Sequence, residues 1–385
     1  MATTSSSTSD GTAFGGAYRG SRVFVTGHTG FKGSWLCEWL LSLGADVTGY
    51  SLPPPTEPAL FEQIELVDRI THIEGDVRDP VHLAKSLGDA APDLIFHLAA
   101  QPLVRESYRT PVETYDTNVM GTIHLLEAAR TLQGPCALVC VTTDKCYENR
   151  EWLYGYREDD PLGGHDPYSS SKAAAEIAIA AWRRSFFEGH PVKVASARAG
   201  NVIGGGDWAT DRIVPDCVRA LHRNEVINVR NRHATRPWQH VLEPLSGYLW
   251  LGARLSQLSV STSGGTDLAY ELCAPFNFGP GHDANRCVAD LVDAIVTHWP
   301  GRWEGGTDPH AVHEAGLLQL ATDRASALLG WSPVWAFADS VRETIRWYRA
   351  ASTDASTDAL RQLTRLQISE YEIAAAHRQL AWAQP

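Results

Sequence analysis

The sequence predicts a doubly wound α/β fold, in which helices cover both faces of an open parallel sheet. Short apolar runs alternate with stretches of helical periodicity, which is the pattern of repeated strand–helix units. In the first unit, a β-branched and aromatic run at Val23–Thr26 leads through three glycines spaced G-x-x-G-x-x-G into a helix at Ser34–Leu43. Ligands of such a sheet bind at the carboxyl ends of its strands.

The glycine turn predicts a dinucleotide site. Gly27 lets the chain turn sharply, Gly30 leaves room for a diphosphate to reach backbone N–H groups, and Gly33 lets the helix lie close to the strand. The positive end of the helix then faces the anion. An ordinary strand–helix connection is the alternative for the motif taken alone. The residues of the turn expected to contact the cofactor are Gly27, His28, Thr29, Gly30, Phe31, Lys32 and Gly33.

The composition excludes several classes of protein. A net charge of -12 over 385 residues, without a basic run, argues against a nucleic-acid partner. No apolar run has the length of a membrane span, and the N-terminus lacks the order of a secretory signal. The seven cysteines contain no C-x-x-C pair, which predicts reduced thiols, a cytoplasmic location and no structural metal. Residues 1–20, rich in Ser, Thr, Gly and Ala, are expected to form a disordered tail.

Four further buried strands are expected in order, at 45–50, 70–74, 94–101 and 138–142. No acid stands at the end of the strand at 45–50, so the preference for NAD over NADP stays open, and Lys32 or a serine could accept a 2′-phosphate.

A capping box at Thr110 with a proline at the first position predicts a helix to about Leu132. Small residues after the fourth strand leave room for a cofactor. Further contacts to it are expected from Asp76, Val77, Leu98, Ala99, Ala100 and Asn118. A solvated turn residue or an N-cap is the alternative for Asp76, and a surface amide or a backbone tie for Asn118.

Tyr168 and Lys172 form the predicted chemical centre. They begin a helix expected from Pro167 to about Phe187, which Asp166 would cap, and their spacing places both on one face. A lysine ammonium and a cationic nicotinamide near a phenol lower its pKa from about 10, so the tyrosine becomes a usable base. The alternative is an exposed Tyr and Lys on an amphipathic helix.

These motifs resemble the extended short-chain dehydrogenases/reductases, from about Arg22 to at least Trp347. In that family the residues matching Thr143, Tyr168 and Lys172 handle a substrate hydroxyl during hydride transfer to NAD. The resemblance implies a Rossmann-type domain and a smaller, interleaved C-terminal substrate lobe.

The pair Asp144–Lys145 beside that threonine is similar to the CDP-glucose 4,6-dehydratase subgroup, as are the segments Thr26–Gly33, Pro53–Pro58, Arg198–Trp208 and Arg236–Val241. An epimerase that works only at C4 needs no further acid and base, whereas a dehydratase does. A structural salt bridge is the alternative for this pair.

The subgroup resemblance implies a lyase that converts CDP-D-glucose to CDP-4-dehydro-6-deoxy-D-glucose and water with recycled NAD, as in deoxysugar biosynthesis. Tyr168 with Thr143 would take the C4 hydroxyl proton, Asp144 would protonate the leaving C6 oxygen, and Lys145 or a nearby group would take the C5 proton. Substrate contacts are expected from Gln101, Asn201, Arg212, Arg236 and His240. Another nucleotide-sugar dehydratase, a C4 epimerase and a non-catalytic dinucleotide-binding protein remain alternatives.

Later elements are expected to divide between the sheet and the lobe. A sixth strand is expected at 193–198, a late strand at 274–279 with a helix at 288–299 beside it, and helices at 323–329, 337–348 and 359–376. The expected division is a dinucleotide-binding domain at 21–200 with returning segments at 228–242 and 274–298, a substrate lobe at 201–227, 243–273 and 299–350, and a C-terminal extension at 351–385. The resemblance also implies a homodimer or homotetramer paired through helices at 111–132 and 167–187.

Overall fold

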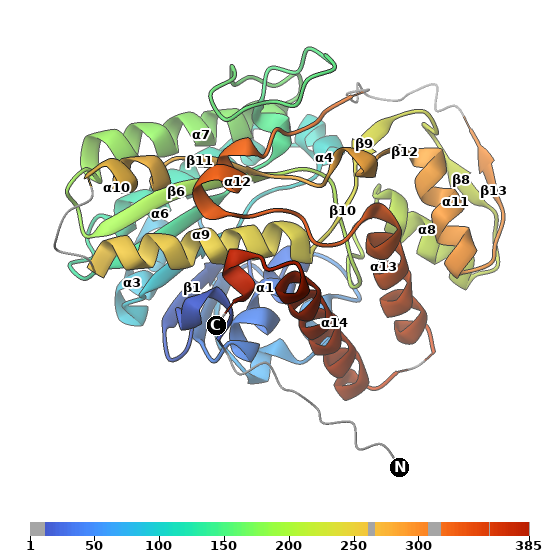
Figure 1. The fold of residues 1–385 in the computed structure, drawn as a ribbon, viewed down its shortest axis with the longest axis horizontal. Helices are drawn as coiled ribbons and strands as arrows, with labels where there is room; N and C mark the ends of the chain where they lie inside the picture. Colours follow the sequence, from blue (N-terminus) through green and yellow to red (C-terminus); the bar gives the residue numbers. More distant parts are fainter. Residues whose placement is uncertain (1–11, 261–265, 307–316, 354, 385) are drawn as a thin grey trace.

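The computed structural model describes residues 12–260, 266–306, 317–353 and 355–384. Its centre is a seven-stranded sheet in the order β11-β6-β5-β4-β1-β2-β3, in which every neighbouring pair is parallel (Figure 1). The strands are β1 (Arg22–Thr26), β2 (Asp46–Ser51), β3 (Thr71–Glu74), β4 (Leu94–His97), β5 (Cys136–Val141), β6 (Val192–Ala199) and β11 (Pro275–Phe278). The strand order reverses between β1 and β4, which is where a doubly wound sheet opens a crevice. The predicted fold class is confirmed.

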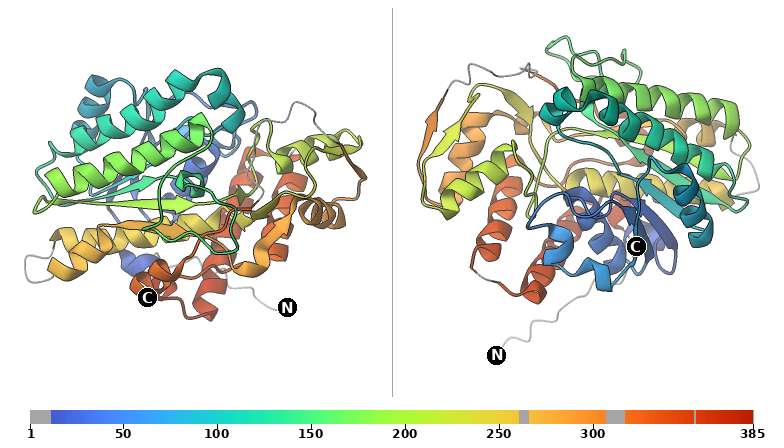
Figure 2. Two further views of the ribbon diagram at one scale, coloured as in Figure 1. Left: turned by 90° about the horizontal axis from the view of Figure 1, so that it is seen from above. Right: turned by 180° about the vertical axis from the view of Figure 1, so that it is seen from behind.

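Helices cover both faces of the sheet, which explains why the inner strands β4 and β5 are buried along their whole length (Figure 2). On one face α3 (Pro80–Ala90), α6 (Gly121–Ala129) and α7 (Pro167–Phe186) bury a core with Phe24 and Leu126. On the other face α1 (Phe31–Ser42) and α9 (Leu242–Val260) bury a larger core. The latter includes Val25, Trp35 and Leu249.

A smaller lobe stands beside the carboxyl edge of the sheet (Figure 1). It contains α8 (Ile213–His222), α11 (Val288–His298) and α13 (Phe337–Ala351), with the paired strands β8 (Ile227–Val229) and β13 (Trp303–Gly305). Two further short pairs join β7 (Val202–Ile203) to β10 (Gln239–His240), and β9 (Thr235–Pro237) to β12 (Asn285–Cys287). The helix expected beside the late strand is α11, and it packs on α13 and α8 in this lobe instead.

The helix predicted from Thr110 to about Leu132 is confirmed as one continuous helix from Pro111 to Ala129, made of α5 (Pro111–Tyr115), a π-helical turn at Asp116–Met120 and α6. A separate short helix, α4 (Val104–Arg109), precedes it. The Thr110 side chain makes no capping hydrogen bond, so the predicted capping box is absent there. Its hydroxyl donates instead to the Glu106 carbonyl of the preceding helix. The predicted Asp166 cap of α7 is confirmed, because its carboxylate accepts from the Ser169 amide at 2.9 Å.

The described part of the N-terminal segment is ordered, which contradicts the expectation of a disordered tail for residues 12–20. Phe14 and Tyr18 are buried there, and Tyr18 donates a hydrogen bond to the Leu249 carbonyl. Residues 1–11 of that expected tail lie outside the described residues. The prediction from composition was wrong here because two aromatic side chains anchor the segment to partners far along the chain.

The C-terminal extension forms one long helix, α14 (Thr357–His377), and a short turn at Ala381–Ala383. α14 packs against α1 and α13 (Figure 1). The sequence predicted the helix, at 359–376, without its location.

All seven cysteines are unpaired thiols, as predicted from their spacing. Of the helices in the described ranges, none combines the length and the apolar character needed to span a bilayer. The remaining helices are α2 (Leu60–Gln63), α10 (Thr266–Leu272) and α12 (Asp323–Leu329), and short 3-10 turns lie at Ala13–Gly16 and Leu66–Asp68.

Candidate active site

The glycine turn takes the form that the motif predicts. Gly27 has φ +76°, and a side chain on it would lie 2.7 Å from the Ala99 amide nitrogen. A side chain on Gly33 would lie 2.2 Å from the Gly27 carbonyl oxygen, so the first turn of α1 rests directly on the loop. Gly30 is the N-cap of α1, and it has extended geometry with no side-chain cap. The N-terminus of α1 therefore presents backbone to an incoming anion, and these residues fit a dinucleotide.

Two side chains of the turn, those of His28 and Thr29, form hydrogen bonds inside the protein. His28 is buried, its Nε2 lies 2.7 Å from His72 Nδ1, and burial lowers its pKa to about 3. Thr29 shares a hydrogen bond with Ser51 at 2.8 Å and donates to the Leu52 carbonyl. The hydroxyl pair occupies the end of β2, where the sequence has no acid for a ribose.

Lys32 and Phe31 extend toward the other side of the turn. The Lys32 ammonium lies 5.8 Å from the ring centre of Tyr248 in α9. Burial and the charge of Arg212 lower its pKa to about 8, while Asp144 acts in the opposite direction. Lys32 therefore belongs to the cluster around Asp144, and the predicted role beside an adenosine 2′-phosphate has no support. The Phe31 ring lies against Gly204, because a Cβ atom placed on this glycine would lie 3.0 Å from the Phe31 ring.

The other predicted cofactor residues line the same sheet edge or support it. The Asp76 carboxylate pairs with Arg78 at 2.6 Å, which is the turn role given as its alternative. Val77 packs on Gly121 of α6. Leu98, Ala99 and Ala100 follow β4, and the Ala99 amide donates to Thr26 Oγ1 at 3.2 Å.

Asn118 acts as a backbone tie, the alternative that the sequence left open. Its Oδ1 accepts from the Gln101 amide at 2.8 Å, and its Nδ2 donates to the Gln101 carbonyl and to Ser171 Oγ. The amide thus joins the loop after β4 to α7. The Gln101 side chain bonds to Leu103 and Thr114, so it supports this loop as well.

The predicted catalytic residues meet at the end of β5. Thr143 and Asp144 follow this strand, both side chains are buried, and Thr143 Oγ1 donates to Asp144 Oδ1 at 3.0 Å. Thr143 is also a hydrogen-bond partner of the Tyr168 hydroxyl. Burial raises the pKa of Asp144, although Lys145, Thr143 and Arg236 act against it. The arrangement joins a hydroxyl, a phenol and a protonatable carboxyl in one buried cluster.

The pKa of Tyr168 departs from the sequence expectation. Burial raises it to about 12, although the hydrogen bond with Thr143 acts downward. Lys172 is buried as well, and its Nζ donates to the Val141 carbonyl at 3.3 Å. Burial lowers the pKa of Lys172 to about 8. The predicted lowering therefore does not arise from the chain alone, since it also requires the positive charge of a bound nicotinamide.

Two residues near this centre escaped the sequence analysis. Tyr248 is fully buried, its pKa is raised by burial and by the charges of Asp144 and Tyr168, and its hydroxyl has no partner among the described residues. Glu176 lies one helical turn beyond Lys172 and is also buried. The spacing of four from Lys172 was the available signal for Glu176. Tyr248 lies in an ordinary apolar helix pattern and gave no signal.

Among the predicted substrate residues, the two arginines lie near Tyr168 and Asp144. Arg212 pairs with Asp207 at 2.8 Å, and its charge acts on Tyr168. Arg236 is buried, and its charge acts on Asp144. Both cations therefore lie by the catalytic cluster. The Asn201 carbonyl accepts from the Gln239 amide between β7 and β10.

His240 packs in the core, which gives no support to the predicted substrate contact. Its ring lies 4.9 Å from that of Trp335 and 5.8 Å from that of Trp35. Burial lowers its pKa to about 3.

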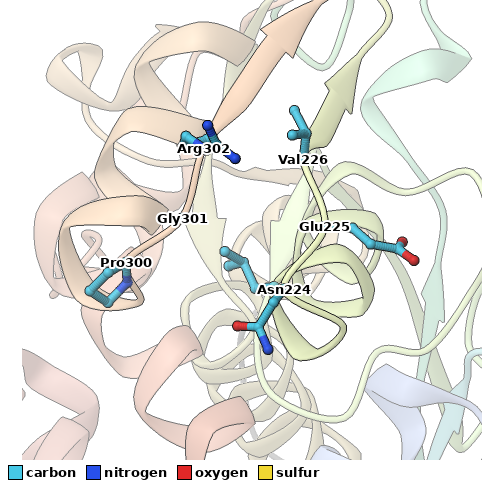
Figure 3. Close-up of a pocket in the computed structure, with 7 residues that line it drawn as sticks. Asn224, Glu225, Val226, Pro300, Gly301 and Arg302 are labelled. Atoms are coloured by element: carbon cyan, nitrogen blue, oxygen red, sulfur yellow. The ribbon is translucent and has the colours of Figure 1, made fainter.

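A separate small pocket of about 110 Å³ opens in the lobe, between the end of α8 and the start of β13 (Figure 3). None of the predicted site residues lines it. Its lining consists of Leu221, Asn224, Glu225, Val226, Pro300, Gly301 and Arg302.

The fold and the cluster define a dinucleotide-binding α/β protein of the kind that carries a Tyr–Lys pair beside the nicotinamide. A family model described as GDP-mannose 4,6 dehydratase matches residues 24–344, and the chain belongs to this family. The CDP-glucose 4,6-dehydratase of Salmonella typhimurium is 47% identical over 342 residues, which cover 86% of this chain and 92% of that protein.

Solved structures share the fold. The dTDP-glucose 4,6-dehydratase DesIV of Streptomyces venezuelae, solved with NAD bound, has a TM-score of 0.70 and 24% identity, covering 87% of this chain and 98% of that one. The dTDP-glucose 4,6-dehydratase of Bacillus anthracis, also solved with NAD, has a TM-score of 0.70 and 20% identity, covering 86% and 98%.

Proposed function

We propose that the chain is an NAD-dependent CDP-D-glucose 4,6-dehydratase that forms CDP-4-dehydro-6-deoxy-D-glucose and water. The observation that carries this proposal is the buried contact between Thr143 and Asp144 beside Tyr168 and Lys172. A dehydratase needs an acid at this position in addition to the Tyr–Lys pair, and the raised pKa of Asp144 suits that role. The 47% identity to the Salmonella typhimurium enzyme supports the choice of CDP-glucose.

The glycine turn and the N-terminus of α1 would hold NAD by its diphosphate. When bound, NAD supplies a hydride acceptor and a positively charged ring beside the phenol. Tyr168 then takes the proton of the sugar C4 hydroxyl. Thr143, which is hydrogen-bonded to the Tyr168 phenol, lies beside that sugar hydroxyl and helps to hold it. Lys172 supplies a positive charge that favours the phenolate.

Elimination requires an acid for the C6 oxygen and a base for the C5 proton. Asp144 donates its proton to the leaving C6 hydroxyl, which departs as water. The hydride taken from C4 would then return to C6 and a proton to C5, which gives the 6-deoxy product and restores NAD. Lys145 is the neighbouring candidate for the base, and its charge acts on Asp144. Lys32 is a second candidate, because a pKa of about 8 leaves part of its population unprotonated near neutral pH.

Arg212 and Arg236 would bind the diphosphate of the sugar nucleotide. Each is a guanidinium whose charge acts on a member of the catalytic cluster. An acidic protein with a net charge of -12 must concentrate positive charge locally to bind such an anion.

The test is incubation of the purified chain with CDP-glucose and NAD, followed by detection of a 4-keto sugar nucleotide. We expect turnover of CDP-glucose well above that of dTDP-glucose, UDP-glucose or GDP-mannose. The Tyr168→Phe variant, which keeps the ring and loses the acidic hydroxyl, is the control and should be inactive. Faster turnover of another sugar nucleotide reassigns the substrate, and a C4-inverted product indicates an epimerase. NAD binding without any reaction indicates a non-catalytic protein.

We also propose that two copies pair through α5–α6 and α7, as predicted from the sequence. These helices expose apolar side chains, including Val112, Met120 and Ile177, which are 83%, 40% and 58% exposed. Sedimentation of the wild type should give a dimer or tetramer, and Ile177→Glu should shift it toward the monomer. The unpaired thiols support a cytoplasmic location.

A further inference from the structure

A single carboxylate joins three elements beneath the proposed catalytic centre. Glu176 on α7 accepts hydrogen bonds from Thr142 Oγ1 at the end of β5, at 2.5 Å, and from Ser196 Oγ in β6, at 2.9 Å. It also accepts from Arg198 Nη2 in β6 at 2.7 Å. Both of its oxygens are therefore fixed, and the carboxylate ties α7 to β6 and to the residue that follows β5. Figure 1 shows α7 above β6.

The partner arginine is anchored in its turn. Arg198 Nη1 donates to the Tyr147 hydroxyl at 2.7 Å and to the Glu158 carbonyl at 3.0 Å. The side chains of Arg198 and Glu176 are only 3% and 2% exposed. A buried ion pair is costly to desolvate, and apolar side chains of similar volume often stabilise a fold equally well. Stability alone therefore does not explain why a carboxylate is buried here, and the groups that Glu176 faces give a better reason.

Glu176 faces the catalytic lysine along α7, because positions four apart share one side of a helix. The titratable groups around Lys172 come from several elements: Glu176 from α7, Cys140 from β5, Cys146 after it, His97 from β4 and Lys32 from α1. Burial raises the pKa of Cys140 to about 12 and also raises that of Cys146. Burial lowers the pKa of His97 to about 3, so this imidazole is neutral. Of these five groups, only Glu176 is negative near neutral pH.

We propose that Glu176 is a positioning residue: its carboxylate fixes Thr142, which follows β5 beside the proposed catalytic residues, and keeps the Lys172 ammonium charged. The inference rests on the proposed function, since it concerns the same Tyr–Lys pair. Thr142, which Glu176 holds, directly precedes the Thr143–Asp144 contact. Burial lowers the pKa of Lys172, and the negative charge of Glu176 acts to raise it.

The charge of Lys172 can be measured without any reaction. The sequence contains five lysines, at positions 32, 85, 145, 172 and 193, so the carbon-13 NMR signals of labelled lysine side chains can be assigned one by one. In the chain without ligands, Glu176→Gln should move the titration of the Lys172 signal down by roughly one pH unit or more. Glu38→Gln is the matched control, because Glu38 is also buried and paired with arginines, Arg69 and Arg365. It should leave the Lys172 signal unmoved.

The pH–rate profile tests the same point during turnover. Glu176→Gln should move the basic limb of kcat down by a similar shift, because Lys172 loses its proton earlier. Thr142→Val removes the hydroxyl but no charge, so it should lower kcat and leave the limb in place. Glu176→Asp keeps the charge with a shorter reach, and its limb should stay close to that of the wild type.

Glu176→Gln leaves Arg198 as an unpaired buried cation, which can prevent folding. The double variant Glu176→Gln with Arg198→Met removes both charges, and it should fold and show the same downward shift of the Lys172 signal. An unmoved Lys172 signal in either folded variant overturns the inference. Failure of the wild type to turn over CDP-glucose overturns the proposed function instead, and it leaves the NMR result standing.

Discussion

Thr143 donates a hydrogen bond to Asp144 across 3.0 Å, and both side chains are buried where β5 ends. This contact joins the Thr143 hydroxyl, which lies beside the Tyr168 phenol, to the Asp144 carboxyl that we propose as the acid. Burial raises the pKa of that carboxyl even though Lys145, Arg236 and Lys32 all act to lower it. Asp144 can therefore hold a proton at a pH where an exposed aspartate has lost it, and a held proton is what expulsion of water requires.

Asp144→Asn should stop dehydration after the first oxidation. The amide keeps the shape and can still accept from Thr143, but it has no proton to give the C6 oxygen. We expect kcat for the 4-keto product to fall by about 10²- to 10⁴-fold, as measured with CDP-glucose. Absorbance of reduced nicotinamide should build up at the same time. Asp159→Asn, at an aspartate that is 83% exposed, is the control and should behave as the wild type. A normal kcat in Asp144→Asn would remove Asp144 from the role of acid.

The base for the C5 proton can be assigned by isotope exchange. Turnover in deuterated water places deuterium at C5, and loss of the base should abolish that label. We expect Lys145→Ala to lose C5 exchange and Lys32→Met to retain it, because Lys145 adjoins Asp144 in the chain. Full exchange in Lys145→Ala together with loss in Lys32→Met would transfer the role to Lys32, whose pKa of about 8 suits a base.

The sequence predicted the sheet, the glycine turn and the catalytic cluster because each depends on local rules. Strand polarity brings Thr143 to the carboxyl edge, and helical spacing brings Tyr168 and Lys172 together. The side-chain directions within the turn were not accessible in the same way. Lys32 looked like a cofactor residue from its position, yet it lies against Tyr248, which is 216 positions later in the chain.

Long-range packing explains what the sequence pattern did not indicate. Phe14 lies in a segment too polar to order itself, and it is fixed by Trp382 at the opposite end of the chain. His240 packs between Trp35 and Trp335, so its predicted substrate contact stays a prediction. The raised pKa of Tyr168 in the chain alone follows from its burial, which cannot be read from a four-residue spacing.

Buried histidines should make the fold sensitive to acid. His97 lies between Thr26 Oγ1 at 2.7 Å and Thr122 Oγ1 at 3.0 Å, and burial lowers its pKa to about 3. The unfolded chain binds a proton there below pH 6.5 and the folded chain does not, so stability falls as the pH drops from 6.5 toward 3. At pH 5 this single histidine should cost about 2 kcal/mol in the free energy of unfolding. His97→Gln should remove that part of the loss, as measured by denaturant titration at pH 7.5 and pH 5.

Glu243 should act with the opposite sign. Its carboxyl is buried and accepts from the Val334 and Trp335 amides and from Tyr371, and burial raises its pKa to about 7. The stability that it contributes is present at low pH and is lost as the pH rises through 7. Glu243→Gln should therefore enlarge the acid loss between pH 7 and pH 5 by about 2 kcal/mol. A change in the same direction as that of His97→Gln would show that burial does not control these two groups.

The two chain ends should stabilise the dinucleotide domain although both lie outside the family match at residues 24–344. Trp382 is fully buried, and its ring stacks on Phe14 at 5.0 Å and on Tyr371 at 5.8 Å, next to Trp39 of α1. Trp382→Ala leaves a cavity, which should lower the free energy of unfolding by about 3–5 kcal/mol in denaturant titration. Trp382→Phe is the control: the indole nitrogen has no partner among the described residues, so only ring area is lost and the cost should be much smaller. Equal unfolding midpoints for the Ala variant and the wild type would mean that the extension folds as an independent appendage.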